Sequence, residues 1–417
     1  MSRAERILHV PRRFVPSEWG GTETVILELS RRQQKSGWKP EILTTLALSD
    51  VRQENFGGVP IRRFGYKYPY FGLSADERLV LDKKAGNMIS PSLFGALLSG
   101  PPVRIFHGHA LSRLGGEVLA AARLRRRPCV FTLHGGVFDV PRTEAASWSA
   151  PVRGKLDWGK PFGALLGVRS LLERADHVIC VGQAEYDAAR AKLPHERVSF
   201  LSNGVDPEKF REGNGREFRR RHEIPQDAFL ILNVSRIDAQ KNQLALLEAF
   251  QLLQARVPAA RLALVGPVTQ PDYRSRIEAF IRENGLTELV CVLPGFQPND
   301  SGLVDAYHAC DAFVLPSVHE PFGIVVLEAW ACKKPVVASN AGGLKALVRP
   351  EETGLQFDPK NGAGELAERL LRLHDRPQER ARLGEAGWRE VEARYTWEAV
   401  EQAQELIYQA AEEHAHG

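Results

Sequence analysis

The chain has 417 residues, which exceeds a single ordinary hydrophobic core and indicates two domains. Hydrophobic residues make up 43% and charged residues 25% of it, a composition that excludes disordered and fibrous proteins. The net charge of +4 is unevenly spread, since residues 1–200 hold 30 Lys and Arg against 19 Asp and Glu, whereas the remainder holds 25 against 32.

Short apolar runs alternate with helical patterns through the first half of the chain. This alternation is typical of a parallel sheet whose strands are joined by crossover helices. The predicted strands cover residues 7–10, 40–46, 103–107, 129–133, 177–181 and 198–201. The segment 202–207 (Ser-Asn-Gly-Val-Asp-Pro) ends the series, because Asn-Gly favours a turn and Pro interrupts a strand. We therefore predict a first domain over residues 1–205.

The same alternation restarts after a polar stretch at 216–223. Predicted strands cover 229–234, 261–265, 289–293, 312–315, 335–338 and 354–357, and helical patterns between them include 243–255, 272–284 and 303–309. A second doubly wound domain is predicted over 206–396, and the helical patterns 365–374, 378–394 and 397–414 close the chain. The predicted fold class is α/β, with two Rossmann-like doubly wound domains.

The sequence also indicates the cellular compartment of the protein. Five cysteines, an odd number without C-x-x-C spacing, indicate free thiols in a reducing compartment. The first apolar stretch is too short for a signal peptide, and no window approaches the roughly 18 apolar residues of a spanning helix. We therefore expect a cytoplasmic protein.

The basic first half, densest at Arg123 and residues 125–127, bears on possible partners. Such a surface suits peripheral contact with anionic lipid at the inner face of the membrane. A solvated helix face explains the charge equally well. No recognised nucleic-acid module accompanies it, so no nucleic-acid partner is expected.

Two cations follow the first predicted strand of the second half. Arg236 and Lys241 stand five positions apart, between the strand 229–234 and the helix 243–255. At such a junction the pair can converge on one pyrophosphate, the Arg through its planar fork and the Lys as a mobile point charge. The competing interpretation is a pair of solvated loop cations.

Two carboxylates flank a turn and a helix start further along. Glu320 follows the strand 312–315, and Glu328 lies eight positions later, on an apolar helix. The N–H groups at the start of that helix are suited to bind a phosphate. The structural alternative for Glu328 is a solvated helix residue. The glycine-containing segment 339–343 ends another strand, where backbone can again approach an anion.

A Gly-Gly turn opens the first predicted helix of the chain. Gly20 and Gly21 precede Glu23 there, and such a turn can wrap an anion with its backbone N–H groups. An ordinary turn is the alternative. The G-x-G-x-x-G pattern of dinucleotide-binding proteins is absent.

Histidines follow two predicted strands of the first half. His134 follows the strand 129–133, and His109 lies just after 103–107, at the sheet edge where open α/β folds bind ligands. A lone histidine is more often a satisfied structural residue than a catalyst, but this position makes both His134 and His109 candidate site residues. Zinc binding by His107, His109 and His134 is a competing hypothesis, weakened because no carboxylate accompanies them at helical spacing.

The acidic pair Glu320-x7-Glu328, with Phe-Gly two positions after the first acid, resembles the signature of retaining glycosyltransferases of family 4. Arg236 and Lys241 fit the same resemblance. It implies the GT-B arrangement, in which two Rossmann-like domains face a cleft, and a last helix over 397–417 that packs on the first domain. It also implies transfer of a hexosyl unit from a nucleotide-diphosphate sugar (a UDP-sugar or GDP-sugar) to a glycan, lipid-linked or small-molecule acceptor in polysaccharide or glycoconjugate biosynthesis.

The resemblance further implies roles for single residues. Arg236 and Lys241 would stabilise the departing diphosphate without a metal or other cofactor, Glu320 would orient the sugar, and Glu328 would bind the ribose. The sequence leaves open whether Glu320 forms a covalent intermediate or the acceptor attacks from the front face. The remaining implied donor residues are Gly20, Gly21, Phe322, Gly323 and Ile324. His134 matches the family's histidine near the anomeric carbon, so we rank it first as a catalytic residue, and His109 second. The implied acceptor residues are Glu23 and His109.

One segment departs from the family pattern. Residues 182–185 read Gly-Gln-Ala-Glu where members often carry Ser or Thr, so no role is carried onto Gly182 and Glu185 is interpreted as structural. Two other functions stay open, because a fold does not fix its chemistry. They are a nucleotide-sugar epimerase or hydrolase of the same architecture and a non-catalytic nucleotide-sugar-binding protein.

Overall fold

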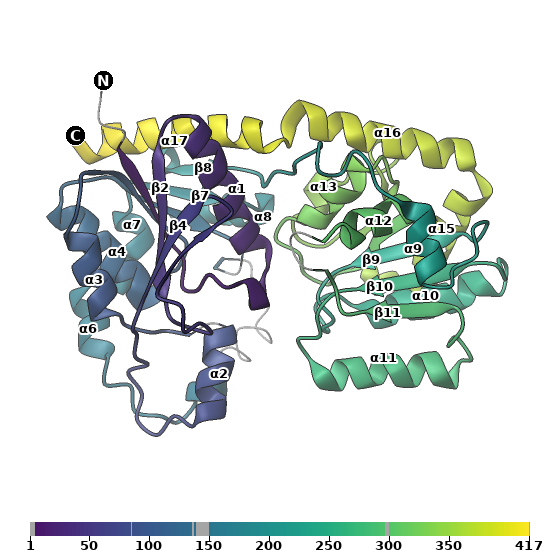
Figure 1. The fold of residues 1–417 in the computed structure, drawn as a ribbon, viewed down its shortest axis with the longest axis horizontal. Helices are drawn as coiled ribbons and strands as arrows, with labels where there is room; N and C mark the ends of the chain where they lie inside the picture. Colours follow the sequence, from purple (N-terminus) through teal and green to yellow (C-terminus); the bar gives the residue numbers. More distant parts are fainter. Residues whose placement is uncertain (1–4, 85, 136, 139–149, 297–299, 417) are drawn as a thin grey trace. The chain divides into compact units, whose positions relative to one another are not determined.

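The computed structural model describes residues 5–84, 86–135, 137–138, 150–296 and 300–416 (Figure 1). The chain divides into two compact units, one made of Met1–Ser202 with Trp397–Gly417 and the other of Asn203–Thr396. Each unit is an α/β body built on its own, mainly parallel sheet. The predicted fold class, with two Rossmann-like units, is confirmed.

The sheet of the first unit has eight strands in the order β3-β4-β2-β1-β5-β6-β7-β8. Their bounds are β1 Arg6–Val10, β2 Lys39–Thr45, β3 Gln53–Phe56, β4 Val59–Phe64, β5 Val103–Gly108, β6 Cys129–Leu133, β7 His177–Cys180 and β8 Val198–Phe200. Neighbouring strands run parallel except β3 and β4. Since β2 and β5 pair with opposite sides of β1, the strand order reverses between β1 and β5, where open α/β sheets bind ligands.

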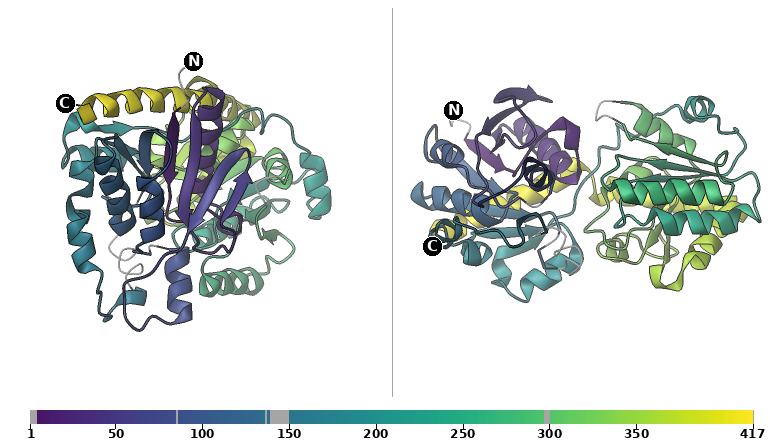
Figure 2. Two further views of the ribbon diagram at one scale, coloured as in Figure 1. Left: turned by 60° about the vertical axis from the view of Figure 1, so that its left-hand side comes forward. Right: turned by 90° about the horizontal axis from the view of Figure 1, so that it is seen from below.

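The first unit also contains α-helices, listed here for the residues that the structure describes. They are α1 Gly21–Lys35, α2 Ala75–Lys83, α3 Pro91–Leu98, α4 Ser112–Leu124, α6 Lys160–Leu165, α7 Leu171–Arg174, α8 Gln183–Arg190 and α17 Trp397–His416. Helix α17, drawn in yellow in Figure 2, returns from the far end of the sequence and packs on α1, β6 and β7. Arg104 of β5 anchors it, because its 5% exposed side chain bonds both Glu405 and Glu412 at 2.7 to 2.9 Å.

The sheet of the second unit has six parallel strands in the order β11-β10-β9-β12-β13-β14. Their bounds are β9 Leu230–Val234, β10 Arg261–Val265, β11 Val290–Leu293, β12 Ala312–Leu315, β13 Val336–Ser339 and β14 Leu355–Phe357. The helices are α9 Gly215–Arg221, α10 Gln243–Gln254, α11 Pro271–Glu283, α12 Gly302–Ala309, α13 Ile324–Ala331, α14 Leu344–Leu347, α15 Ala363–Asp375 and α16 Pro377–Arg394. With β10 on one side of β9 and β12 on the other, the strand order reverses between β9 and β12.

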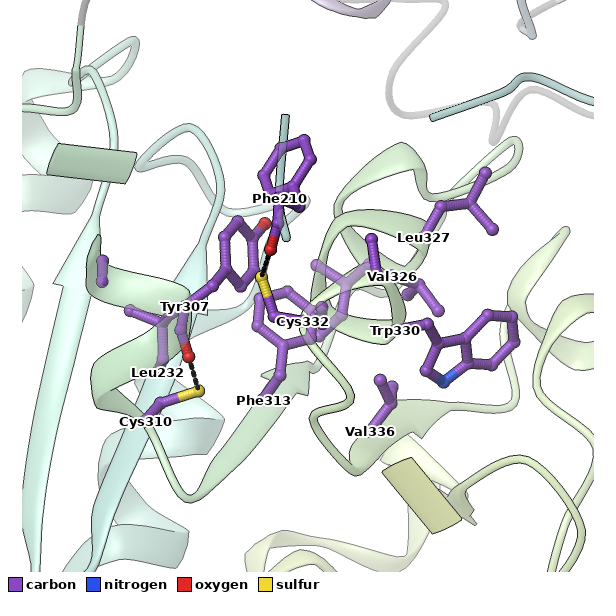
Figure 3. Packing of buried hydrophobic residues seen from close by; sticks show 14 of the residues in the cluster. Phe210, Leu232, Tyr307, Cys310, Phe313, Val326, Leu327, Trp330, Cys332 and Val336 are labelled. Carbon is purple, nitrogen blue, oxygen red and sulfur yellow. Dashed lines mark hydrogen bonds between the residues drawn. The ribbon is translucent and has the colours of Figure 1, made fainter. Parts of the chain in front are cut away.

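Two buried clusters cover the two faces of this second sheet, because successive strand residues point to opposite sides. Leu230 and Leu232 of β9 belong to one cluster, together with Tyr307 and Trp330 (Figure 3). Ile231, which lies between the two leucines in sequence, belongs to the other. Burial on both faces explains why the strands read as nearly continuous apolar runs.

The observed strands agree with the predicted ones to within one residue at each end. The predicted set lacks β3 and β4, which form a polar antiparallel pair at the sheet edge, and α9 forms where a polar stretch is predicted. All five cysteines are free thiols. Among the helices that the structure describes, none combines the length and apolar character needed to cross a membrane.

Candidate active site

The loop between β9 and α10 carries the two predicted cations. The side chain of Arg236 is 38% exposed, and its guanidinium lies 3.2 Å from Asp238 and 3.3 Å from the amide oxygen of Gln240. The side chain of Lys241 is 13% exposed, and its Nζ bonds Oε2 of Glu320 at 2.6 Å. Both cations are therefore ion-paired, and the side chain of Arg236 is the more exposed of the two.

Buried polar contacts fix the backbone of this loop. Gln243, the fully buried first residue of α10, donates to the carbonyl oxygen of Arg236 at 2.7 Å. Asp238 accepts from the backbone N–H of Lys241 at 3.1 Å and from the hydroxyl of Thr269 at 3.0 Å. The positions of both cations are thus set by the scaffold rather than by solvent.

Glu320 reaches the same place from the neighbouring strand. It follows β12, and its 11% exposed carboxylate is bonded by Lys241 and by the hydroxyl of Ser317, the latter at 3.4 Å. Gln240 joins the two loops, because its side-chain N–H donates to the carbonyl oxygen of His319 at 3.0 Å. The structure therefore brings the cation loop and the predicted sugar-side acid together where the strand order reverses.

Helix α13 begins at Ile324, directly after Gly323, which has a φ of 100° that favours glycine. No described side chain caps this start, so its first N–H groups are available to a ligand. Phe322 is buried in the core, so any contact it makes with a donor would come from its backbone. The predicted donor residues of this segment therefore offer a ligand the backbone N–H groups at the start of α13.

Close packing of backbone constrains the glycines of the segment 339–343, where the sequence predicts that backbone can approach an anion. A Cβ on Gly342 would lie 2.4 Å from the carbonyl oxygen of Glu320, and one on Gly343 would lie 2.0 Å from that of Pro321. The backbone N–H of Gly343 donates to Glu320 at 2.7 Å. Close packing of two backbones explains these glycines, and it fixes the backbone that carries Glu320.

Glu328 lies on α13 and is partly buried rather than a solvated surface residue. The hydroxyl of the fully buried Tyr307, on α12, donates to its Oε2 at 2.7 Å. Burial raises the pKa of Glu328, and the Tyr307 bond and the charge of Lys209 oppose that shift. One carboxylate oxygen is therefore committed to the protein, and the other can serve a ligand.

In the first unit, Gly20 and Gly21 form the start of α1. Glu23 is 5% exposed and folds back over that start, since a Cβ on Gly20 would lie 3.3 Å from its Oε2. Burial raises the pKa of Glu23, whereas the charge of Arg13, 3.7 Å away, lowers it. A donor phosphate at Gly20 and Gly21 would share the space with this carboxylate.

The two predicted histidines lie at the carboxyl ends of the adjacent strands β5 and β6 and contact each other directly. Nδ1 of His109 lies 2.9 Å from Nε2 of His134, and Nε2 of His109 lies 3.0 Å from Nδ1 of His9. Burial lowers the pKa of His134 and of His9 to about 4 and that of His109 well below its usual value. All three imidazoles are therefore neutral at pH 7.

Glu185, interpreted as structural from the sequence, orders the segment that follows His134. Its carboxylate accepts from the backbone N–H groups of Gly135 and Val137 at 3.1 and 3.0 Å. The side chain is 1% exposed. Glu185 thus has a structural role, as interpreted from the sequence, and supports backbone that follows a candidate catalytic residue.

The histidines that lie close enough together to bind a metal ion are not the three that the zinc hypothesis names. In the described part of the chain, His9, His107 and His109 have ring nitrogens within 4.8 Å of one another, and His134 is not in that set. Both ring nitrogens of His107 are already engaged at 2.7 Å, with Tyr408 and Thr132. A metal ion would have to break these bonds.

Sequence reasoning missed several residues that hold these clusters together. His9 had a signal, because it interrupts an otherwise apolar strand at the sheet edge where ligands bind. Nothing in the sequence marks Gln33 or Tyr307, since each lies within an ordinary helical pattern. Their roles follow only from which side chains the fold places beside them.

Two family models match most of the chain. Glycosyl transferases group 1 matches residues 214–389, and Glycosyltransferase Family 4 matches residues 19–209. The D-inositol 3-phosphate glycosyltransferase of Kribbella flavida is 29% identical over 414 residues, covering 94% of this chain and 91% of the relative. The enzyme of the same name from Thermomonospora curvata is 35% identical over 385 residues, covering 87% and 84%.

Solved structures share the fold over nearly the whole length. Sucrose-phosphate synthase from Thermosynechococcus elongatus has a TM-score of 0.73 at 24% identity and covers 97% of this chain and 98% of its own. Anabaena HepE in complex with UDP and glucose has a TM-score of 0.73 at 21% identity and covers 97% and 99%. At these identities the likeness shows the fold.

Proposed function

The chain belongs to the glycosyl transferases of group 1, glycosyltransferase family 4, and from that premise we propose that it moves a hexosyl unit from a nucleotide-diphosphate sugar to an acceptor hydroxyl, with retention of configuration. Glycosyl transfer itself follows from the family. The donor class, the acceptor, the stereochemistry, the residue roles and a place in polysaccharide or glycoconjugate synthesis are the proposal.

The observation that carries the proposal is the cluster of Arg236, Lys241 and Glu320 between β9 and β12. A ligand at this edge meets two cations and the uncapped start of α13. Cations and helix N–H groups are the partners that a diphosphate requires, and the reversal of strand order is where α/β sheets take such ligands.

Lys241 is proposed to contact both Glu320, on the sugar side, and the diphosphate of the donor. Its ammonium has three N–H donors, of which one faces Glu320, so the others can turn to a phosphate. As the bond between the anomeric carbon and the diphosphate breaks, negative charge grows on the leaving oxygen, and Lys241 and Arg236 stabilise it. A preorganised group of this kind contributes roughly 3–4 kcal/mol.

Two routes would give retention at this site. In front-face attack the acceptor oxygen bonds the anomeric carbon on the side of the departing diphosphate, whose oxygen takes the acceptor proton. In double displacement the carboxylate of Glu320 bonds the anomeric carbon as the diphosphate leaves, and the acceptor oxygen then displaces Glu320 as its proton passes to the departed diphosphate. We propose that the reaction needs no metal ion, because two cations and a helix start already supply positive charge. Loss of activity on chelation, with all other ions controlled, would contradict that.

Glu328 is proposed to bind the ribose of the donor. Its Oε2 is occupied by Tyr307, so Oε1 remains to accept hydrogen bonds from vicinal hydroxyls. The Anabaena HepE complexes contain UDP and UDP-glucose, so UDP-sugars are the first donors to test.

The first unit is proposed to contribute the acceptor side, through His109 and Glu23, and to place His134 near the anomeric carbon as a catalytic residue. The relatives named above act on D-inositol 3-phosphate, so a polyol phosphate is the first acceptor to test. A basic first half suits a phosphorylated or lipid-linked acceptor and an anionic membrane surface.

One set of measurements tests the proposal. UDP, GDP and ADP are each screened for a rise in unfolding temperature, and the matching sugar donor is then incubated with and without acceptors. We expect a new glycoside whose anomeric configuration, read by NMR, matches that of the donor. Rapid epimerisation or hydrolysis without acceptor, or tight binding with no turnover over a broad acceptor panel, would overturn it.

A further inference from the structure

A continuous chain of polar side chains leads from the C-terminal helix to His134 within the first unit. Gln33 of α1 contacts Gln404 of α17 at 2.8 Å and His9 of β1 at 2.9 Å. His9 contacts His109 at 3.0 Å, and His109 contacts His134 at 2.9 Å. Four bonded steps therefore join the far helix to the candidate catalytic histidine.

The direction of these hydrogen bonds is set at Gln33. Its amide N–H donates to Oε1 of Gln404, so its amide oxygen is the atom that faces Nε2 of His9. A carbonyl oxygen only accepts, and therefore Nε2 of His9 carries the hydrogen. A neutral imidazole has one N–H group, which leaves Nδ1 of His9 as an acceptor.

The same constraint passes along the chain ring by ring. Nδ1 of His9 accepts from Nε2–H of His109, so Nδ1 of His109 is bare and accepts from Nε2–H of His134. Each imidazole is neutral, because burial lowers the pKa of all three. The sequence of donors and acceptors ends at Nδ1 of His134, which has no hydrogen-bond partner among the described residues.

A second branch supports the orientation of the Gln33 amide. The same amide N–H group also lies 3.3 Å from the hydroxyl oxygen of Tyr408, which lies 2.7 Å from Nδ1 of His107. If Tyr408 donates to His107, its oxygen is free to accept from Gln33, and Nε2–H of His107 donates to Thr132 at 2.7 Å. Every bond of this branch is then satisfied, and among the described buried atoms of the network Nε2 of Gln404 has no hydrogen-bond partner.

We propose that Gln33, His9 and His109 are positioning residues that fix the tautomer of His134, so that its Nε2 is protonated and its Nδ1 is presented to a ligand as a hydrogen-bond acceptor. His134 would then select a ligand group that donates a hydrogen bond, such as a hydroxyl, over one that only accepts. The selection of a hydroxyl by His134 rests on the proposed glycosyl transfer, whereas the tautomer of His134 does not.

The tautomer can be read directly in the protein without substrate. Histidine labelled with nitrogen-15 is incorporated into the full chain, and long-range proton–nitrogen correlation spectra distinguish the two neutral forms of each ring. The signals of His134 are assigned by their loss in His134→Asn. We expect the Nε2–H form for His134, His109 and His9, with the other form of His134 below about one part in ten, as one or two net hydrogen bonds would produce.

Gln33→Leu removes the group that sets the direction of the chain. We expect the Nδ1–H form of His134 to rise to a comparable population and kcat/KM for transfer to fall about tenfold. Gln34→Leu is the matched control, because Gln34 lies beside Gln33 on α1 and donates to the carbonyl oxygen of Gly58 at 2.9 Å. It should change neither quantity.

The possible results separate the two proposals. An Nδ1–H form of His134 in the wild-type protein would overturn the inference and leave glycosyl transfer untouched, and so would an unchanged tautomer in folded Gln33→Leu. If Gln33→Leu does not fold, the wild-type spectrum alone decides. If His134 has the Nε2–H form but the protein transfers no sugar, the proposed function is wrong and the inferred hydrogen-bond network is supported.

Discussion

Replacement of Lys241 by Met tests the proposed diphosphate site most directly. Met keeps much of the length of the side chain and removes the charge. In the structure the ammonium bonds Glu320 at 2.6 Å, and the two side chains are only 13% and 11% exposed. Solvent is therefore poorly placed to compensate either charge when the other is removed.

The size of the effect follows from these positions. At an effective dielectric constant of about 20, a unit charge about 4 Å from a phosphate charge interacts by about 4 kcal/mol. Loss of Lys241 also leaves Glu320 unpaired, and at about 6 Å its carboxylate would repel a phosphate by about 3 kcal/mol. Ions and relaxation screen part of this, so we expect a loss of about 3–4 kcal/mol, or about 10² to 10³-fold in kcat/KM.

The assay combines initial rates with calorimetry of the nucleoside diphosphate. Lys241→Arg keeps the charge and should retain most of the affinity, and Lys345→Met, at an exposed position on α14, should change nothing. Glu320→Gln frees Lys241 and removes a repulsive charge, so the diphosphate should bind more tightly while transfer falls. Wild-type affinity and turnover in Lys241→Met would refute the assignment of Lys241 to the diphosphate.

Three further predictions concern other parts of the chain. Tyr307→Phe removes the donor that holds Glu328 and should weaken nucleoside-diphosphate binding about five- to tenfold in calorimetry, with an unchanged circular dichroism spectrum. Arg104→Met deprives two carboxylates of α17 of their shared partner and should lower the free energy of unfolding in urea by about 2–3 kcal/mol. The pKa of His9 and of His134 is lowered to about 4, so the unfolded chain binds more protons below pH 6.5. Stability from these neutral rings should be complete above pH 6.5 and be lost as pH falls toward 4, and a flat urea midpoint between pH 7 and pH 5 would contradict it.

Most strands of the two units could be predicted from the sequence because their residues are buried on both faces of the sheet. A strand such as β9 has no polar side to present, so its residues form one apolar run that stands out from the helices around it. The pair β3 and β4 lies at the edge of its sheet, and along both strands less exposed residues alternate with more exposed ones. Neither strand therefore forms a continuous apolar run that the sequence alone would reveal. Pairing with a neighbour, rather than local pattern, makes it a strand.

The sequence predicted which loops form the candidate site but not the contacts between their side chains. Arg236, Lys241 and Glu320 stand at the ends of strands, and parallel strands bring their carboxyl ends to one edge. The sequence could not show that Lys241 bonds Glu320, because that contact depends on β9 and β12 being neighbours although they are not consecutive in the chain. Their adjacency is a property of the topology.

The chemistry of the first unit was the least accessible from sequence. His134 and His109 could be singled out as histidines after strands, but which ring nitrogen faces which neighbour depends on Gln33, more than 70 positions away in the chain. A pattern search has no access to such a relation, since glutamine in the last turns of an amphipathic helix is unexceptional.

The split of the first unit between Met1–Ser202 and Trp397–Gly417 has a consequence for the order in which the protein matures on the ribosome. Synthesis delivers β1 to β8 first, yet Arg104 finds no carboxylates and Gln33 no Gln404 until α17 emerges. The second unit is encoded in one uninterrupted stretch and can be finished earlier. A nascent chain that stalls before α17 would therefore carry a complete second unit and an incomplete first unit, and translation of α17 would complete the unit whose strands were synthesised first.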